Sequence, residues 1–198
     1  MNSIGKLSGL LMALTLLLAA GAARAQWELD NDKSTVNFVS IKNDKVAEIH
    51  SFTSLVGYIG ANGRVQLGID LDSVETLIPI RNERMRELLF DTAKFPAAKI
   101  SAQVDPVILA ATADGGVVTA DLPITLSLHG IEQTLTAPVV VVREGDNRLR
   151  VLTSRPVLVN AVDFGLDSGI TALREIAGLK AISVAVPVTL QLVFIPAD

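Results

Sequence analysis

Few side chains in this chain of 198 residues could carry out acid–base or metal chemistry. It has no cysteine, so thiolate nucleophiles and thiolate metal ligands are absent, and its two histidines are His50 and His129. His50 lies two residues from Glu48, which would place both side chains on one face of a strand, where they could act as a base or bind a metal. Two such groups without further ligands make a weak site, and we expect His50 to be a hydrogen-bonded polar residue at the rim of the fold.

The remaining motifs of catalysis are missing from the sequence. His129 ends an alternating run directly before Gly130, which is typical of a turn residue. We find no Gly-x-Ser-x-Gly, His-Glu-x-x-His, P-loop or dinucleotide-binding glycine pattern. The sequence therefore predicts that the protein is not an enzyme and has no catalytic residue, no metal and no cofactor.

Three arginines, Arg81, Arg84 and Arg86, lie close together in a charged stretch between apolar runs. Pro79 suits a first helical position, and the spacing of the apolar residues that follow predicts a short helix near residues 79–89. We expect its apolar stripe to consist of Met85, Leu88 and Leu89, with the arginines on the outer face. Two roles stay open: the arginines are solvated, with Arg86 paired to Glu83, or Arg81 and Arg84 bind the polar head group of a ligand.

Most of the chain alternates apolar and polar residues with a period of two, the pattern of half-buried strands. In the three clearest runs, the apolar residues share one strand face. These residues are Val65, Leu67, Ile69 and Leu71 in the first run, Leu122, Ile124, Leu126 and Leu128 in the second, and Val184, Val186, Val188, Leu190, Leu192 and Phe194 in the third. Further strands are predicted at residues 35–41, 46–52, 99–104, 135–142 and 148–159. Turn signals separate these runs, and a second short helix is predicted near residues 170–178. About eight antiparallel strands favour a sandwich or a closed barrel.

The first 25 residues have the composition of a secretory signal peptide. Lys6 precedes an uncharged run, and Ala23-Arg24-Ala25 provides small residues at a cleavage position, so we expect cleavage after Ala25 and export. Removing Lys6 and Arg24 lowers the number of basic residues from 17 to 15, against 21 acidic residues. This acidic mature chain is unsuited to nucleic acid, and we predict neither nucleic-acid binding nor stable membrane insertion. The sequence leaves a homodimer open.

Several segments together carry a family resemblance: Asp72-Ser73-Val74-Glu75-Thr76, the helix from Arg81 to Asp91, Lys94-Phe95-Pro96, Ile100-Ser101-Ala102, Leu126 to Ile131, and Val162-Asp163-Phe164-Gly165. In order and spacing they resemble the signature of the YceI-like family, and the resemblance runs from Trp27 to the C-terminus. The helix departs from the family pattern at Asn82, Arg84 and Met85, where aspartate, histidine and leucine are usual.

The resemblance implies an all-β fold, an extended lipocalin-like antiparallel eight-stranded β-barrel formed by residues 26–198. It further implies a periplasmic protein of a bacterium that binds, transports or stores a long isoprenoid lipid, with a polyprenyl or quinone-type tail, in the barrel lumen. The residues themselves leave an alternative: the aliphatic side chains fill the lumen, and the protein is an envelope-stress or interaction module.

For the lipid-binding interpretation, the inward side chains predict the ligand site. The expected lining residues are Phe38, Val65, Leu67, Ile69, Met85, Leu89, Ile100, Leu122, Ile124, Leu126, Val151, Phe164, Val186, Val188 and Leu190. Arg81 and Arg84 are the candidates for the head group.

Overall fold

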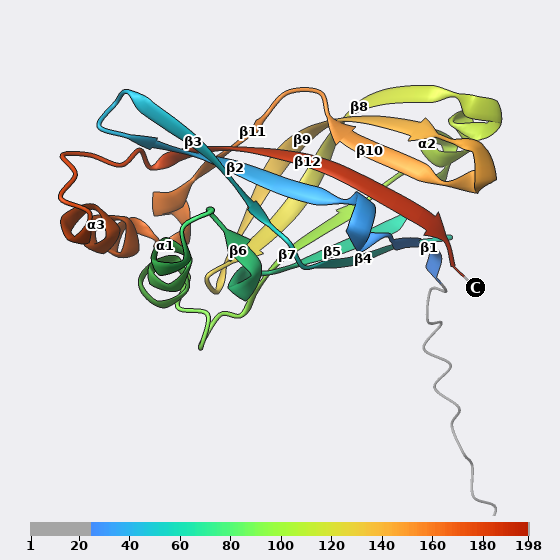
Figure 1. Cartoon of the computed structure of the whole chain (residues 1–198). Helices are drawn as coiled ribbons and strands as arrows, with labels where there is room; N and C mark the ends of the chain where they lie inside the picture. Colours follow the sequence, from blue (N-terminus) through green and yellow to red (C-terminus); the bar gives the residue numbers. More distant parts are fainter. Residues whose placement is uncertain (1–24, 198) are drawn as a thin grey trace, which may run out of the picture.

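The computed structural model describes residues 25–197, and strands make up most of this region (Figure 1). The predicted signal peptide lies outside the described residues, apart from Ala25, with which the first strand begins. The strands are β1 (Ala25–Leu29), β2 (Thr35–Lys42), β3 (Val46–Phe52), β4 (Leu55–Gly60), β5 (Arg64–Asp70), β6 (Val74–Glu75), β7 (Ala97–Gln103), β8 (Val117–Leu128), β9 (Ile131–Arg143), β10 (Leu149–Thr153), β11 (Val157–Asn160) and β12 (Ala185–Pro196). The α-helices of the same region are α1 (Pro79–Arg84), α2 (Pro106–Ala111) and α3 (Asp167–Ile176). A π-helix, η3 (Met85–Phe90), follows α1, and the short 3-10 turns are η1 (Asn31–Lys33), η2 (Leu71–Ser73), η4 (Ala113–Gly115), η5 (Gly145–Asn147) and η6 (Ala161–Phe164).

Eight of the described strands form a closed antiparallel ring. The order around the ring is β1-β4-β5-β7-β8-β9-β10-β12, and β12 pairs with β1, where Trp27 lies opposite Pro196. Closure leaves these strands without a free sheet edge, which removes the usual site of strand-to-strand aggregation. The predicted all-β fold with an eight-stranded antiparallel barrel is confirmed.

The barrel is longer than this ring because three of its walls continue as second strands. After short interruptions, β2 follows β1, β11 follows β10, and β3 precedes β4. The long strand β12 joins the two parts: its residues 191–196 pair with β10 and β1, and its residues 185–191 pair with β11 and β2. Figure 1 shows β2 and β3 reaching beyond the ring toward α1 and α3. This extension is the part of the barrel that holds the candidate site.

The β8–β9 hairpin shows how the sequence sets which side chains point inward. His129 and Gly130 form its two-residue turn, with φ of 52° and 78°, and two-residue hairpin turns of this kind require such positive values. Pairing then runs from Leu128 opposite Ile131 along the whole hairpin, which places Ile124 and Leu126 on the inner face. The prediction that His129 is a turn residue is therefore confirmed.

The predicted strands all appear, but several details were wrong. The segment 148–159 forms two strands, β10 and β11, because Pro156 between them has no N–H for a continuous ladder. Val184 precedes β12 and is 39% exposed, so it does not belong to the inner face of that strand. β1, β4, β6 and α2 were not predicted; β4 has two glycines and no polar–apolar alternation to reveal it.

Helical segments cover one end of the barrel, and α2 lies at the other end (Figure 1). The helix predicted near residues 79–89 is α1 continued by η3, and Pro79 begins it as expected. The helix predicted near residues 170–178 is α3, which begins earlier, at Asp167, and ends at Ile176. α3 packs closely on η3 at Gly169, where a Cβ atom would lie 2.5 Å from the carbonyl oxygen of Leu88. The glycine thus allows the two helical segments to close this end together.

The apolar stripe predicted for the first helix was partly wrong. Met85 is buried as expected, but Leu88 is 37% exposed, while Phe90 and Asn82 are buried instead. A π-helix closes its hydrogen bonds five residues apart, so a stripe drawn with the α-helical period loses its register along η3. Phe90, five residues after Met85, takes the inward position that the α-helical pattern assigned to Leu88.

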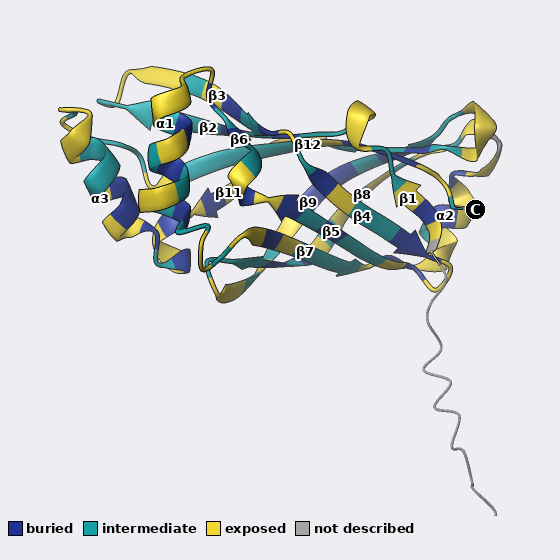
Figure 2. Cartoon of the chain, turned by 60° about the horizontal axis from the view of Figure 1, so that its bottom comes forward, coloured by how far each residue is buried: buried dark blue, intermediate teal, exposed yellow. Residues whose placement is uncertain are grey.

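The half of the barrel near α2 is filled by packed side chains. Trp27, Leu149 and Phe194 are at most 2% exposed there, and the Trp27 indole donates a hydrogen bond of 2.9 Å to the carbonyl oxygen of Asn147. The Arg143 guanidinium lies 5.2 Å from the centre of the Trp27 ring, a cation–π contact. Figure 2 shows buried residues along the strands of this half. Any space inside the barrel must therefore lie toward α1 and α3.

Candidate functional site

A cavity of about 450 Å³ lies in the half of the barrel that α1, η3 and α3 cover. This volume falls within the range of about 300–1,000 Å³ typical of small-ligand pockets. Buried side chains such as Val36, Ile69 and Leu126 form its inner end. Ile78 and Ile80, which are 43% and 52% exposed, line it where it approaches the surface beside α1. The lumen is thus filled at one end and hollow at the other, so the alternative of a barrel filled throughout was wrong.

Many of the side chains that the sequence assigned to the lumen do line this cavity. They are Phe38, Ile69, Met85, Leu89, Ile100, Ile124, Leu126, Val186, Val188 and Leu190, together with Arg81 and Arg84. Adjacent residues such as Thr189 do not line it, which agrees with the predicted register of β12.

Five predicted lining residues lie away from the cavity. They are Val65, Leu67, Leu122, Val151 and Phe164, which pack in or against the hydrophobic core. Leu67, for example, is only 3% exposed. Phe164, which is 1% exposed, lies in the turn η6 before α3 and not on a strand. A period of two identifies the inner face of a strand but carries no information on depth along the barrel. The sequence could therefore not separate residues of the filled half from residues of the hollow half.

The sequence predicted the second helix, α3, but not the residues of it that line the cavity. Leu166 directly before α3, and Ile170 and Leu173 within it, line the cavity. Their spacing of three and four residues is the signal of a helix face, but it does not indicate against which surface that face packs. Phe52 and Phe90, which also line the cavity, were not predicted either.

Polarity rises along β2 and β3 from the inner end of the cavity toward its mouth. The facing pairs are first Val36 with Phe52, then Phe38 with His50, then Ser40 with Glu48. The first pair is wholly apolar, the second half aromatic and half polar, and the third polar. A ligand that matches this wall has an apolar body deep in the barrel and a polar group near the far ends of β2 and β3.

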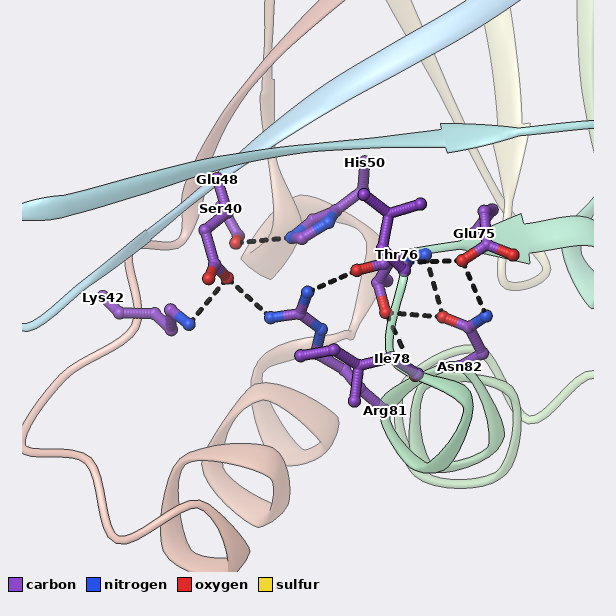
Figure 3. A network of polar contacts seen from close by, with 10 residues as sticks. Ser40, Lys42, Glu48, His50, Glu75, Thr76, Ile78, Arg81 and Asn82 are labelled. Atoms are coloured by element: carbon purple, nitrogen blue, oxygen red, sulfur yellow. Dashed lines mark hydrogen bonds and ion pairs between the residues drawn. The ribbon is translucent and has the colours of Figure 1, made fainter.

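Charged groups at the polar end form a connected network (Figure 3). The Glu48 carboxylate accepts hydrogen bonds from Lys42 and from Arg81, each at 2.6 Å. The hydrogen bond from Lys42 and the charges of both cations hold the pKa of Glu48 below its ordinary value, although partial burial raises it. Arg81 also donates to the carbonyl oxygen of Thr76 at 2.6 Å. This arginine therefore joins β3 to the segment before α1, which fixes the helix over the cavity.

A second set of polar contacts holds the loop between β6 and α1 (Figure 3). The Asn82 side-chain oxygen accepts from the Thr76 backbone N–H at 2.9 Å and from its hydroxyl at 2.5 Å. Its side-chain nitrogen donates to Glu75 at 3.1 Å, and Glu75 also accepts from the N–H of Leu77. The Asn82 contact is the main reason that the pKa of Glu75 lies below its ordinary value. Leu77 keeps a φ of 62° within this network, a conformation that a leucine rarely adopts.

The arginines of the helix differ in their surroundings. Arg84 lines the cavity, and no hydrogen bond or ion pair holds its guanidinium within residues 25–197. Arg86 donates to the carbonyl oxygen of Asp72 at 3.2 Å, and the structure does not show the predicted pair with Glu83. The expectation that all three arginines face outward was wrong, because Arg81 and Arg84 lie on the same helix face as Met85.

His50 lies deeper than predicted. It is 3% exposed and lines the cavity, so the expectation of a rim position was wrong. Its Nε2 atom lies 2.9 Å from the Ser40 hydroxyl, and its ring packs at 5.2 Å from the Phe38 ring. Burial and, next, the charge of Arg81 lower the pKa of His50, so the ring is neutral at neutral pH. His50 and Glu48 share a strand face, as predicted, but Glu48 bonds to Lys42 and Arg81 instead.

Within residues 25–197, no group of three or more histidine and acidic side chains is placed to hold a metal ion. No helix in the same part of the chain has the length and apolar character needed to cross a membrane.

The chain is similar to one protein family and to several solved structures. A YceI-like domain matches residues 27–194. Among solved structures, a polyisoprenoid binding domain from Saccharophagus degradans, implicated in plant cell wall breakdown, is 38% identical with a TM-score of 0.85, over 88% of this chain and 100% of that one.

More distant structures share the fold alone. Burkholderia cenocepacia BcnA is 21% identical with a TM-score of 0.65, over 83% of this chain and 98% of its own. A mutant YCEI protein from Campylobacter jejuni is 13% identical with a TM-score of 0.52, over 75% and 84% of the two chains. No curated protein matches the chain. Because the domain match spans nearly all of the barrel, the chain belongs to the YceI-like family.

Proposed function

We propose that this protein binds one long isoprenoid lipid in the cavity and carries or stores it in the periplasm. The observation that supports this proposal is the change in polarity along the cavity wall. The lining side chains are aliphatic at the inner end and polar near Ser40 and Glu48. Burial of apolar surface contributes about 25 cal/mol per Å², so a wall of this kind binds a hydrocarbon tail without any catalytic group.

The relative from Saccharophagus degradans supports the choice of ligand. That domain is described as polyisoprenoid binding, and this chain covers all of it at 38% identity. Branched isoprenoid units also suit a wall made of valine, leucine and isoleucine side chains, which leave a wide space with few aromatic rings.

For the head group, we propose Arg84 and not Arg81 as the cationic contact. Both guanidinium groups line the cavity, but Arg81 already bonds to Glu48 and to the Thr76 carbonyl group. Among the Arg81 nitrogens only the buried Nε lacks a partner, whereas the whole guanidinium of Arg84 is left for a ligand oxygen. Its planar fork suits a head group with two acceptor oxygens. The lipid is the only bound molecule that this function requires, and it acts as cargo in a protein without catalysis.

The location follows from the predicted signal peptide, which ends at Ala25, so we propose export and a mature chain that begins at Gln26. The test of the function is to express residues 1–198 in a bacterium, recover the protein from the periplasmic fraction and determine its N-terminus. Extraction with organic solvent and mass spectrometry should then show about one isoprenoid lipid per protein. Retention of residues 1–25, or an extract without isoprenoid lipid, would contradict the proposal.

A further inference from the structure

The wall of the cavity contains a hydrogen-bonded pair that the proposed contacts with Arg84 do not use. Ser40 of β2 and His50 of β3 both line the cavity, and the Ser40 hydroxyl oxygen lies 2.9 Å from His50 Nε2. The His50 side chain is almost completely buried, and its Nδ1 atom has no hydrogen-bonding partner among residues 25–197. The Ser40 hydroxyl makes no other hydrogen bond in the same part of the chain.

The pair has one hydrogen-bond donor left over, whichever way the hydrogen atoms are arranged. A neutral histidine and a serine together carry two hydrogens for donation, one on the ring and one on the hydroxyl. If Nε2–H donates to Ser40, the hydroxyl hydrogen remains unused. If the hydroxyl donates to Nε2, the ring hydrogen is on Nδ1 and remains unused. Each tautomer of His50 therefore leaves one donor that needs an acceptor.

The described cavity wall offers no acceptor for this donor. Its polar side chains, apart from the pair, are Lys42, Arg81, Arg84 and Ser183. The first three are cations and only donate. The Ser183 hydroxyl donates to the Ala185 carbonyl oxygen at 3.0 Å and accepts from the Ala185 N–H at 3.2 Å, and it makes no hydrogen bond with Ser40 or His50. A buried donor without an acceptor destabilises a fold, so such groups in cavities indicate where a ligand supplies the missing partner.

We propose that Ser40 and His50 form a subsite that donates one hydrogen bond to an uncharged oxygen of the lipid, such as a hydroxyl, ether or carbonyl oxygen. The subsite spans the facing pairs Phe38–His50 and Ser40–Glu48, the level at which the wall changes from apolar to polar. The rings of Phe38 and Phe52 beside it exclude the water that a charged phosphate would need. This inference rests on the proposed function, because it names the part of the isoprenoid ligand that the cavity recognises.

The test uses the mature protein after removal of bound lipid and three probes of equal chain carbon number: squalene, hexaprenol and hexaprenol methyl ether. The double variant Ser40→Ala, His50→Phe removes both hydrogens, and its two apolar replacements leave no polar group unpaired. It should bind hexaprenol and the methyl ether about 3- to 10-fold more weakly than the unaltered protein does, with squalene binding unchanged. Thr189→Ala is the control, since this hydroxyl lies on β12, the strand paired with β2, but does not line the cavity, and it should change no affinity.

The unaltered protein should bind the methyl ether as tightly as the alcohol, because the subsite needs only an acceptor on the lipid. An ether bound as weakly as squalene would overturn the inference. An equal loss for squalene in the double variant would also overturn it, since the pair would then act through packing alone. If squalene binds and the double variant loses nothing, the subsite is wrong and the proposed function stands. If none of the three lipids binds to the unaltered protein, the proposed function itself fails.

Discussion

Two alanines on the inner face of the barrel provide a matched test of its filled and hollow halves. Ala98 of β7 and Ala137 of β9 are 4% and 2% exposed, but only Ala98 lines the cavity. Replacing either with leucine adds the same three carbon atoms inside a strand, so differences in strand propensity largely cancel. The two variants therefore differ in whether free space receives the larger side chain.

The expected energies have opposite signs. At Ala98, burial of three methylene equivalents contributes at most about 2.4 kcal/mol, and ordering the leucine side chain costs about 0.5–1 kcal/mol. Ala98→Leu should thus be neutral or stabilising by up to about 1.9 kcal/mol. At Ala137 the added atoms overpack a filled core, which costs about 1–3 kcal/mol. The two variants should differ by about 1–5 kcal/mol in their free energy of unfolding.

The assay is urea unfolding of the two lipid-free variants beside the unaltered protein, with the amount of retained isoprenoid measured on separate samples. Ala98→Leu should retain less lipid because the leucine occupies part of the cavity. If both variants lose stability to the same extent, the space at Ala98 is filled and our description of the lumen is refuted.

Three further predictions concern the polar end of the cavity. Since the pKa values of Glu48 and His50 are lower in the folded state, the unfolded state binds more protons, so stability should be full above pH 6.5 and fall in two steps, below pH 6.5 and again below pH 4.5. His50→Phe should remove the upper step in urea unfolding measured across this range, and an unchanged step would show that another group causes it. Asn82→Ala should cost about 1–3 kcal/mol of unfolding free energy, because it leaves a buried backbone N–H without its acceptor; a loss below this range would contradict the role of this network. Arg84→Lys should weaken retention of a lipid with an oxygenated head group at unchanged thermal stability, whereas Arg81→Lys should lower the melting temperature; the reverse result would exchange their roles.

The sequence predicted the fold well because alternation along a strand reports directly which side chains point inward. Leu126 and Val188 were placed on the inner face by this period alone, and the structure puts both at the cavity. The period does not report how far along the barrel axis a residue lies. Leu67 of the filled half and Ile69 of the hollow half were therefore both predicted to line the ligand site. Only the pairing of strands around the barrel distinguishes such neighbours.

The polar end was harder to predict because its residues come from segments far apart in the chain. Arg81 reaches Glu48 across 33 residues, and His50 is buried by Phe38 of the neighbouring strand and by the helix that covers the cavity. A π-helix also changed the inward side of residues 85–90, and local sequence gave no sign of that change.

The central claim is that an isoprenoid tail lies in the hollow half of the barrel with its oxygen-bearing end toward Arg84. A crystal structure of the protein loaded with hexaprenol tests this most directly. We predict continuous density for the tail along Leu126 and Val188, with its oxygen at the polar end of the cavity. Density for the lipid on the outer surface only, with the inner side chains closed together, would contradict the claim.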